Sequence, residues 1–531
     1  MSAEFKKTIE NGGAILGIEF GSTRIKSVLT DADHAILATG IYDWENSFTD
    51  GVWTYPMEQI IKGLQGSYAS LVSDVREKYD TDITELAAVG ISGMMHGYLP
   101  FDKDGNQLAE FRTWRNTMTA EAAGVLSREF DFNIPQRWSI AHLYQAILNG
   151  EAHVKDIAFL TTLAGYIHFR LTGEKNMGVG EASGMFPIDP ETCDYDEKML
   201  ASFAKLIADK GFGWDLKSIL PKVLSAGEKA GNLTEEGAKL LDVSGKLKAG
   251  APFAPCEGDA GTGMCATDAV APGTGNISAG TSVFSMVVLE KNLSKPHEEI
   301  DVVTTPDGLP VAMVHCNNCS SDINAWVKLF ADFASVMGLD VNTGDIYTKL
   351  FTDAYKNGAK DCGGVVSINY FSGEPVTGLV NGRPMVVRTP DAAFSISNFM
   401  RSNIYSAFAT LKYGNDILSR EEKITTKNMM AQGGLFKTPL AAQQMLADAL
   451  NCPVTVPDTA SEGGAWGMAV LAAYMLNKAE GEKLGDYLHN KVFAGLSGKT
   501  LDPDADGVKG FDKYMESYKE ALKAEKVAAD N

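Results

Sequence analysis

Short apolar runs alternate with longer segments of helical periodicity in the first half of the chain. Residues 14–20 (AILGIEF), 25–30 (IKSVLT) and 34–40 (HAILATG) are short and rich in aliphatic and β-branched side chains, which predicts three neighbouring strands. Residues 57–79 carry apolar side chains at helical spacing and end in charged residues, which predicts a helix. Residues 85–93 (ELAAVGISG) predict a buried strand, because small and β-branched residues dominate the run.

Three further segments have the pattern of helices. Residues 134–150 and 157–173 each end in a glycine, the residue that most often follows a helix. Residues 511–531 predict an amphipathic helix that frays into a polar tail. The first half of the chain therefore has the mixture of strands and helices that is typical of an α/β protein.

The strand pattern starts again near residue 250. Residues 251–270 lead into 275–290, which predicts a strand, a bend and a second strand. The bend Gly280-Thr281-Ser282 repeats the type of the earlier bend Gly21-Ser22-Thr23. This internal similarity predicts two related α/β domains that face one another across a cleft, with residues 1–249 in the first and residues 250–531 in the second.

A third glycine site lies near the C-terminus. Residues 428–456 predict a strand, a break at Gly433-Gly434, and a helix from about Thr438 with Pro439 in its first turn. Bare backbone between a strand and a helix can accommodate a flat ring or a phosphate, although an ordinary turn explains the same residues. No G-x-x-x-x-G-K-[ST] sequence occurs in the chain, which excludes a Walker loop.

Composition restricts the class of protein. A chain of 531 residues is too long for one core, which favours two domains. The net charge of −21 argues against nucleic acid or an anionic membrane as the main partner. No run of 18 apolar residues and no signal-peptide pattern occurs, and the seven cysteines are scattered, so we expect a cytoplasmic protein with buried thiols. A homodimer is compatible with this composition.

The glycine bends have the chemistry of phosphate sites. A Gly-Ser/Thr-Ser/Thr bend presents backbone N–H groups and hydroxyl donors, and glycine allows close approach of a ligand. Beside the first bend, Glu19 can hold Mg²⁺ through water and Lys26 can add positive charge. The alternative is that both bends are ordinary hairpin turns, and for either bend alone that is the stronger interpretation.

Two other residues are candidates for chemistry. Asp259 lies between glycines at the expected start of a helix, where it either caps the helix or accepts a proton from an attacking hydroxyl. His96 follows a strand at the end where α/β domains bind ligands, or it is a packed core residue. Cys316 and Cys319 form a lone C-x-x-C without a second ligand pair, so we expect neither zinc nor a redox site.

Taken together, these motifs resemble the FGGY carbohydrate kinases over roughly residues 13–520. The matching segments are EFGSTRIK at 19–26, GDA at 258–260, SAGTS at 278–282 and GGLFKTPLAAQQMLAD at 433–448. LTGE at 171–174 and ASG at 182–184 also occupy their family positions. The resemblance implies two actin-like (ribonuclease H-like) domains facing a central cleft that holds ATP and a sugar.

The resemblance also implies roles for individual residues. Asp259 would be the catalytic base and, together with Glu19, would hold Mg²⁺ through water. The residues implied to bind ATP are Gly21, Ser22, Thr23, Lys26, Gly280, Thr281, Ser282, Gly433 and Gly434. The cofactors implied are ATP and Mg²⁺, and the partner implied is a small sugar.

The sugar is indicated by MMHG at 94–97, which resembles the Gln-Met-His-Gly of xylulokinases and implies that Met95 and His96 contact a ketose. Trp114 resembles the tryptophan of the family's Trp-x-Asp-x-Arg. D-xylulose, giving D-xylulose 5-phosphate, is the first candidate; L-ribulose or another ketose or polyol is the alternative. An alternative of a different class is a non-catalytic ATP-binding protein of the actin and Hsp70-like type.

Four positions depart from the family pattern. Two of them, Ala260 in place of an amide and Met118 in place of an arginine, remove polar groups that would recognise hydroxyls, so the substrate cannot be transferred directly from the xylulokinases. The other two are Glu19 and Gly178, each in place of an aspartate. Polar residues proposed to replace the lost amide are His315, Asn317 and Asn318.

Overall fold

The computed structural model describes residues 2–457, 463–495 and 498–529. The chain forms two compact units. Unit 1 comprises Met1–Val270, Val302–Val311 and Ser461–Ala494, and unit 2 comprises Ala271–Asp301, Ala312–Ala460 and Gly495–Asn531. Both units combine strands and helices, so the α/β class expected from the sequence is confirmed. The predicted boundary at 249/250 falls inside unit 1.

Unit 1 is built on a five-stranded sheet in the order β13-β6-β1-β2-β3. Its strands are β1 (Ile15–Phe20), β2 (Arg24–Thr30), β3 (Ile36–Asp43), β6 (Ala88–Gly93) and β13 (Glu257–Gly258). β2 runs antiparallel to β1 and to β3, whereas β6 runs parallel to both β1 and β13. The carboxyl ends of β1, β6 and β13 therefore meet at one edge of the sheet.

Shorter elements surround this sheet. The further strands of the first part of the chain are β4 (Ser47–Thr49), β5 (Val52–Thr54), β7 (Leu99–Phe101), β8 (Phe159–Thr161), β9 (Asn176–Gly178), β10 (Ile188–Asp189), β11 (Asp194–Tyr195) and β12 (Lys222–Leu224). β16 (Asp301–Thr304) is instead the edge strand of the second large sheet. The helices are α1 (Ser2–Glu10), α2 (Met57–Tyr79), α3 (Ala120–Phe130), α4 (Ser139–Leu148), α5 (Leu163–Thr172), α6 (Val179–Ala182), α7 (Glu197–Leu206), α8 (Leu216–Ile219), α9 (Glu235–Leu241), α10 (Asp259–Cys265), α15 (Gly464–Asn477) and α16 (Leu484–Tyr487).

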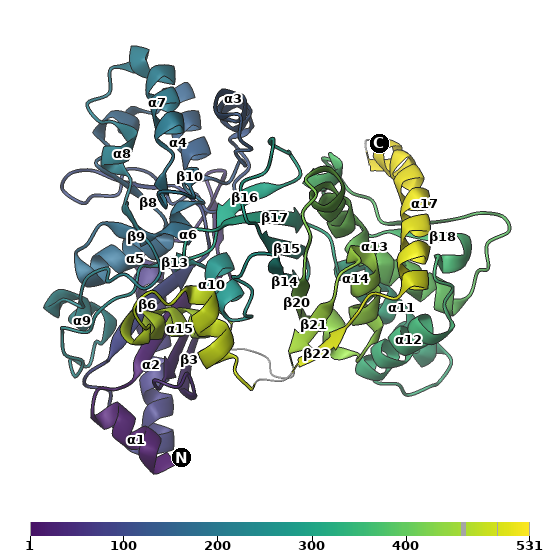
Figure 1. Ribbon diagram of the computed structural model, residues 1–531, viewed down its shortest axis with the longest axis horizontal. Coiled ribbons are helices and arrows are strands. Elements are labelled where there is room, and N and C mark those ends of the chain that lie inside the picture. Colours follow the sequence, from purple (N-terminus) through teal and green to yellow (C-terminus); the bar gives the residue numbers. More distant parts are fainter. Residues whose placement is uncertain (1, 458–462, 496–497, 530–531) are drawn as a thin grey trace. The chain divides into compact units, whose positions relative to one another are not determined.

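Two helices cover opposite faces of the unit 1 sheet. A Cβ on Gly17 would lie 2.1 Å from the carbonyl oxygen of Ala465, so α15 packs directly on β1. A Cβ on Gly40 would lie 2.1 Å from the carbonyl oxygen of Ser67, so α2 packs equally closely on β3. Gly17 is paired with Val28 and Gly40 with the adjacent Ser27, and neighbouring strand residues point to opposite faces. Figure 1 shows α15, a late segment of the chain, beside the early strands.

Unit 2 repeats the strand topology of unit 1. β17 (Pro310–Cys316), β15 (Val283–Val288), β14 (Thr274–Ala279), β20 (Asn428–Gly433), β21 (Val454–Pro457) and β22 (Gly498–Leu501) lie side by side in that order. β14 is antiparallel to β15 and parallel to β20, and β20 is parallel to β21. The first five strands thus correspond to β3-β2-β1-β6-β13, which explains why the two glycine bends resemble each other in sequence.

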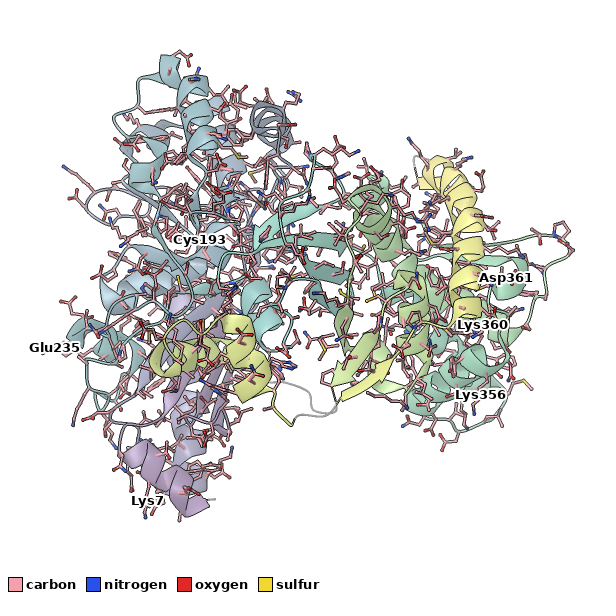
Figure 2. All side chains as sticks on the ribbon, viewed as in Figure 1. Lys7, Cys193, Glu235, Lys356, Lys360 and Asp361 are labelled. Atoms are coloured by element: carbon pink, nitrogen blue, oxygen red, sulfur yellow. The ribbon has the colours of Figure 1, made fainter. Side chains whose placement is uncertain are left out.

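Helices and a small hairpin complete unit 2. These elements are α11 (Ser321–Val336), α12 (Thr343–Asn357), β18 (Val365–Ile368), β19 (Met385–Arg388), α13 (Ile396–Asp416), α14 (Ala441–Leu450) and α17 (Ala505–Ala529). Buried Phe511, Tyr514 and Tyr518 attach α17 to the core. Two surface ion pairs add to this attachment, and Lys360 and Asp361 are labelled in Figure 2: Asp361 pairs with Lys513 of α17 at 2.5 Å, and Lys360 pairs with Asp504, the residue before α17, at 3.2 Å.

Two helix predictions need correction. Residues 157–173 form β8 and then α5, because β8 pairs with β7 and Thr162 caps α5 by accepting the N–H of Gly165 at 3.3 Å. The helix predicted from about Thr438 is α14, which begins at Ala441 because Leu440 has a φ of 72°, outside the helical region. Pro439 therefore precedes the helix instead of lying in its first turn.

Candidate active site

The carboxyl ends of three strands bring four of the predicted site residues together in unit 1. Glu19 on β1 is in register with Ser92 on β6, which in turn is in register with Glu257 on β13. Met95 and His96 follow β6 directly, and Asp259 follows β13 as the first residue of α10. Parallel strands present such residues at the same edge of the sheet, where α/β proteins bind ligands.

Asp259 lies at the centre of this group. Its Oδ1 accepts the backbone N–H of Met95 at 3.3 Å. More than a third of the residue is accessible to solvent, yet protein atoms surround the carboxylate on its other sides, and this burial raises its pKa to about 6. α10 is held in place by a 2.9 Å hydrogen bond between the hydroxyls of Thr262 and Ser92. Asp259 is thus a fixed, solvent-accessible carboxylate with a proton affinity near neutrality.

Glu19 is half-buried and accepts the backbone N–H of Ala465 at Oε2, 3.2 Å away. Burial, and next the negative charge of Asp259, raise the pKa of Glu19 to about 7, while Lys26, opposite Glu19 on β2, lowers it. Two carboxylates that repel each other create a local negative potential that a cation would relieve.

These donors fit a magnesium ion held through water. Mg²⁺ prefers oxygen ligands and retains several waters, so one or two carboxylates satisfy it. Within the described residues no group of three or more His, Cys, Asp or Glu side chains is arranged to hold a metal ion directly. Indirect contact from Glu19 and Asp259 is the arrangement that this donor set favours.

The first glycine bend, Gly21-Ser22-Thr23, joins β1 to β2. Its three carbonyl oxygens are all hydrogen-bonded: Gly21 O accepts the indole N–H of Trp44 at 2.7 Å, and Ser22 O accepts the hydroxyl of Tyr55 at 2.6 Å. Thr23 O accepts the backbone N–H of Trp44 at 3.2 Å. Because carbonyls repel anions, tying them to Trp44 and Tyr55 suits a bend that binds phosphate through its N–H and hydroxyl groups.

The second bend, Gly280-Thr281-Ser282, joins β14 to β15 in unit 2 and has its carbonyls bound in the same manner. Gly280 O accepts the backbone N–H of Ser320 at 3.2 Å, Thr281 O accepts that of Cys319 at 2.9 Å, and Ser282 O accepts that of Gly280 at 2.8 Å. In both hairpins the carbonyls are thus occupied, and the glycine N–H closes the turn, to Arg24 O at 2.9 Å in the first and to Ser282 O at 2.8 Å in the second. A structural likeness at this level of detail was not visible in the sequence.

Gly433 and Gly434 end β20 in unit 2 and differ in conformation. Gly433 has φ 123° and ψ 176°, a region open essentially to glycine alone. A Cβ on Gly433 would lie 2.0 Å from the carbonyl oxygen of Ala279, its partner on β14. A Cβ on Gly434 would meet nothing within 4 Å. Gly433 is therefore required by the fold, whereas Gly434 leaves open space beside the backbone.

His96 is buried and lies in a turn with positive φ, 69° at His96 and 100° at Gly97. Its Nδ1 lies 3.0 Å from the carbonyl oxygen of Gly184, and its ring packs on Trp138. A carbonyl only accepts, so Nδ1 carries a proton and donates it to Gly184. Non-glycine residues with positive φ are uncommon and concentrate at functional sites.

The remaining predicted residues lie elsewhere. Trp114 and Met118 lie on the irregular segment between β7 and α3, 36% and 41% exposed, and neither takes part in the hydrogen bonds given above for Asp259 and His96. The Asn318 side chain accepts backbone N–H groups of Phe371 and Ser372 within unit 2, so it is used to hold that loop. The hypothesis that His315, Asn317 or Asn318 replaces the sugar-binding amide stays a prediction.

The cysteines are thiols, as expected. All seven are free, six are buried, and Cys193, labelled in Figure 2, is half-buried. Burial raises the pKa of Cys319 to about 12, so this thiol is not activated for redox chemistry at neutral pH.

Sequence reasoning missed Glu181 and Glu257, two fully buried carboxyl groups beside Asp259. The one available signal was a charged residue at 257 within an otherwise apolar run.

Comparison with known proteins decides the family. The profile of the N-terminal domain of the FGGY family of carbohydrate kinases matches residues 14–265, and that of its C-terminal domain matches residues 275–476. The chain belongs to the FGGY family. It is therefore a phosphotransferase that uses ATP to phosphorylate a sugar, and the non-catalytic alternative is set aside. The actin-like fold expected for both units follows from the same membership.

Individual FGGY relatives are similar at low identity. The chain is 22% identical over 501 residues to a xylulose kinase of Haemophilus influenzae, covering 91% of this chain and 96% of that protein. The structure of a xylulose kinase from Rhodospirillum rubrum aligns with a TM-score of 0.78 at 17% identity, covering 96% of this chain and 98% of that one. A gluconate kinase from Lactobacillus acidophilus aligns with a TM-score of 0.76 at 18% identity, covering the same shares.

The protein has no candidate membrane span within the part of the chain that the structure describes, since no helix there is both long and apolar enough.

Proposed function

We propose that this FGGY kinase transfers the γ-phosphate of ATP to the terminal hydroxyl of D-xylulose, giving D-xylulose 5-phosphate. The observation that carries the proposal is the hydrogen bond that places Asp259 beside Met95, next to His96, within MMHG. The similar xylulose kinases of Haemophilus influenzae and Rhodospirillum rubrum support the choice of sugar. L-ribulose, or another ketose or polyol, is the second candidate, because Ala260 and Met118 lack the polar groups of the family pattern.

In the proposed reaction, the oxygen of the sugar's terminal hydroxyl attacks the γ-phosphorus while Asp259 accepts the proton of that hydroxyl. The bond between that phosphorus and the bridging oxygen of ADP breaks, and ADP leaves with the electron pair. Met95, His96 and Trp114 orient the sugar. In phosphoryl transfer, positioning of the reactants and electrostatic stabilisation supply most of the rate enhancement. A site made of hydrogen-bond donors and one base, without a protein nucleophile, suits this reaction.

For the nucleotide, we propose that the bends Gly21-Ser22-Thr23 and Gly280-Thr281-Ser282, with Lys26, bind the phosphates, and that Gly433-Gly434 lies against the adenosine. Glu19 and Asp259 would hold Mg²⁺ through water. When bound, the ion neutralises charge on the phosphates. In this scheme residues 1–249 supply the sugar contacts and one bend, and residues 250–531 supply Asp259, the other bend and the adenosine contact.

A coupled ADP-release assay with Mg-ATP against ketopentoses, ketohexoses and polyols tests the substrate. We expect the highest kcat/KM for D-xylulose. A higher kcat/KM for L-ribulose or a polyol would refute the proposed sugar but not the family, and no stimulation by any sugar would refute the proposed acceptor class.

We also propose a homodimer. α11 exposes apolar side chains at helical spacing: Leu329 is 52%, Phe333 62% and Val336 85% exposed, and Met337, which caps the C-terminus of the helix, is 61% exposed. Contiguous exposed apolar area of this kind marks interfaces, and a stable interface buries roughly 800 Å² per partner. A dimeric mass in light scattering that becomes monomeric in Phe333→Glu supports the dimer, and a monomeric wild type refutes it.

A further inference from the structure

The carboxyl group of Glu257 occupies a pocket lined by glycines from a segment some 80 residues earlier in the chain. Glu257 is only 1% exposed. A Cβ on Gly178 would lie 2.1 Å from Glu257 Oε1, and a Cβ on Gly180 would lie 2.4 Å from Oε2. Neither position can carry a side chain while Glu257 is in place, so the two segments are fitted to each other.

The function of this carboxyl group can be read from its partners. Gly178 is the N-cap of α6 and has no side chain to offer the first N–H groups of that helix. The N–H of Glu181, the third residue of α6, instead donates to Glu257 Oε2 at 2.9 Å. Burial raises the pKa of Glu257 to about 8, and the backbone N–H groups of Glu181, Gly180 and Gly258 oppose that rise. An N-cap side chain normally accepts the N–H of the second or third helical residue.

We infer that Glu257 caps α6 from another strand, in place of an N-cap side chain at position 178, and thereby positions the sugar-binding His96. The aspartate that the FGGY pattern has at 178 would put a carboxylate into the same space and offer it to the same N–H groups. The departure at Gly178 is thus compensated by Glu257, and only one of the two positions can carry the carboxyl group at a time.

The cap is connected to the active site at both ends. Beyond α6, the hydroxyl of Ser183 accepts the N–H of Thr304 at 3.0 Å, and the carbonyl of Gly184 is bonded to His96. On the other side, Glu257 lies two residues before Asp259. Glu257 is therefore a positioning residue for the sugar site, an assignment that rests on the proposed function.

A double-mutant cycle tests whether a carboxyl group at position 178 can replace the one at position 257. Gly178→Asp alone places two carboxyl groups in one space, and Glu257→Gly alone leaves buried N–H groups of α6 without an acceptor, so each should lower the melting temperature. The double variant should recover the part of the loss that the two carboxyl groups cause, with a coupling of about tenfold in the unfolding equilibrium constant. The new Cβ still lies 2.7 Å from the carbonyl oxygen of Cys256, so the double variant should melt below the wild type. Additive losses would overturn the inference.

If a single variant fails to fold, Glu257→Gln and Glu257→Ala replace it. Glutamine keeps an acceptor oxygen in the same place, so it should melt within about 2 °C of the wild type, whereas alanine should melt at least about 4 °C lower. Equal losses in the two variants would overturn the cap.

The kinetic readout separates positioning from stability. Glu257→Ala should raise KM for the sugar about tenfold and leave KM for ATP within about twofold, with Glu257→Gln near the wild type. Equal changes in both KM values would overturn the positioning role. If the wild-type protein shows no sugar-dependent ADP release, the proposed function fails, while the melting-temperature cycle still decides whether Glu257 caps α6.

Discussion

Replacing Gly433 by alanine adds a methyl group where β20 meets β14. That methyl would lie 2.0 Å from the carbonyl oxygen and 2.8 Å from the carbonyl carbon of Ala279, atoms that cannot rotate away because they belong to the paired strand. The backbone at Gly433 also has φ 123° and ψ 176°, which an L-residue adopts only under strain. The substitution therefore meets two independent penalties.

The magnitude follows from these two terms. A non-glycine residue in this region of φ and ψ costs about 1–3 kcal/mol. Moving β20 away from Ala279 weakens the last rung of the pair, which adds about 1 kcal/mol. The total of about 2–4 kcal/mol corresponds to a fall in melting temperature of about 5–15 °C for a unit of this size.

The matched control is the neighbouring glycine. Gly434→Ala meets no atom within 4 Å and needs no unusual φ, so its melting temperature should stay within about 1–2 °C of the wild type. If the adenosine lies against Gly434, the added methyl should raise KM for ATP about tenfold, with KM for the sugar unchanged. Thermal unfolding and steady-state kinetics on the two variants measure both effects.

Two results would refute this reasoning. A Gly433→Ala protein with the melting temperature of the wild type would show that β14 and β20 relax around the added methyl group without loss of stability. A Gly434→Ala protein that loses as much stability would show that the space beside the backbone is not open. Unchanged KM for ATP in Gly434→Ala would separately refute the placement of the adenosine.

Three further predictions concern the proposed chemistry and one buried acid. Asp259→Asn should lower kcat by about 10²–10⁴-fold while ATP still binds; because the pKa of Asp259 is raised to about 6 and the base must be unprotonated, wild-type kcat/KM should fall about tenfold per pH unit below that value. Retained turnover, or a flat profile down to pH 5, would contradict its role. Gly184→Ala brings a Cβ within 2.7 Å of His96 Nδ1 and should raise KM for the sugar but not for ATP; a proportional rise in both would count against His96 as a sugar contact. Burial raises the pKa of Glu374 to about 7, so the folded state holds a proton that the unfolded state releases near pH 4.5, and wild-type stability falls as pH rises between these values. Glu374→Gln has no such proton to lose, so its free energy of unfolding in urea should rise by about 2–3 kcal/mol relative to that of the wild type as pH rises from 4.5 to 7. A difference between the two proteins that does not change with pH would rule this linkage out.

Much of the site's framework could be predicted because it depends on local pattern. The strands on either side of Gly21-Ser22-Thr23 were visible as apolar runs separated by turn residues, and His96 and Asp259 were recognisable from their places after a strand and before a helix. β8 was missed because it is only three residues long and its apolar Phe159 and Leu160 come just before the apolar first turn of α5. Thr162 between them was the available signal, as a helix cap.

Other features depend on contacts between distant segments, which a single sequence does not display. Gly178 and Glu257 belong to different motifs, and nothing local shows that one makes room for the other. The side-chain bonds from Trp44 and Tyr55 to the first bend are likewise long-range. The hydrogen bonds by which Asn318 holds the loop at Phe371 and Ser372 are also long-range.

The position of α15 has a consequence for biosynthesis. Its backbone lies directly on Gly17 of β1 and supplies an N–H to Glu19, yet it is made long after residue 270, where the first stretch of unit 1 ends. At 5–20 residues per second, roughly 10–40 s pass before α15 can leave the ribosome. During that delay one face of the central sheet has no helix to cover it. Nascent chains should therefore depend on chaperones at this stage, and a fragment ending at residue 270 should aggregate when expressed alone.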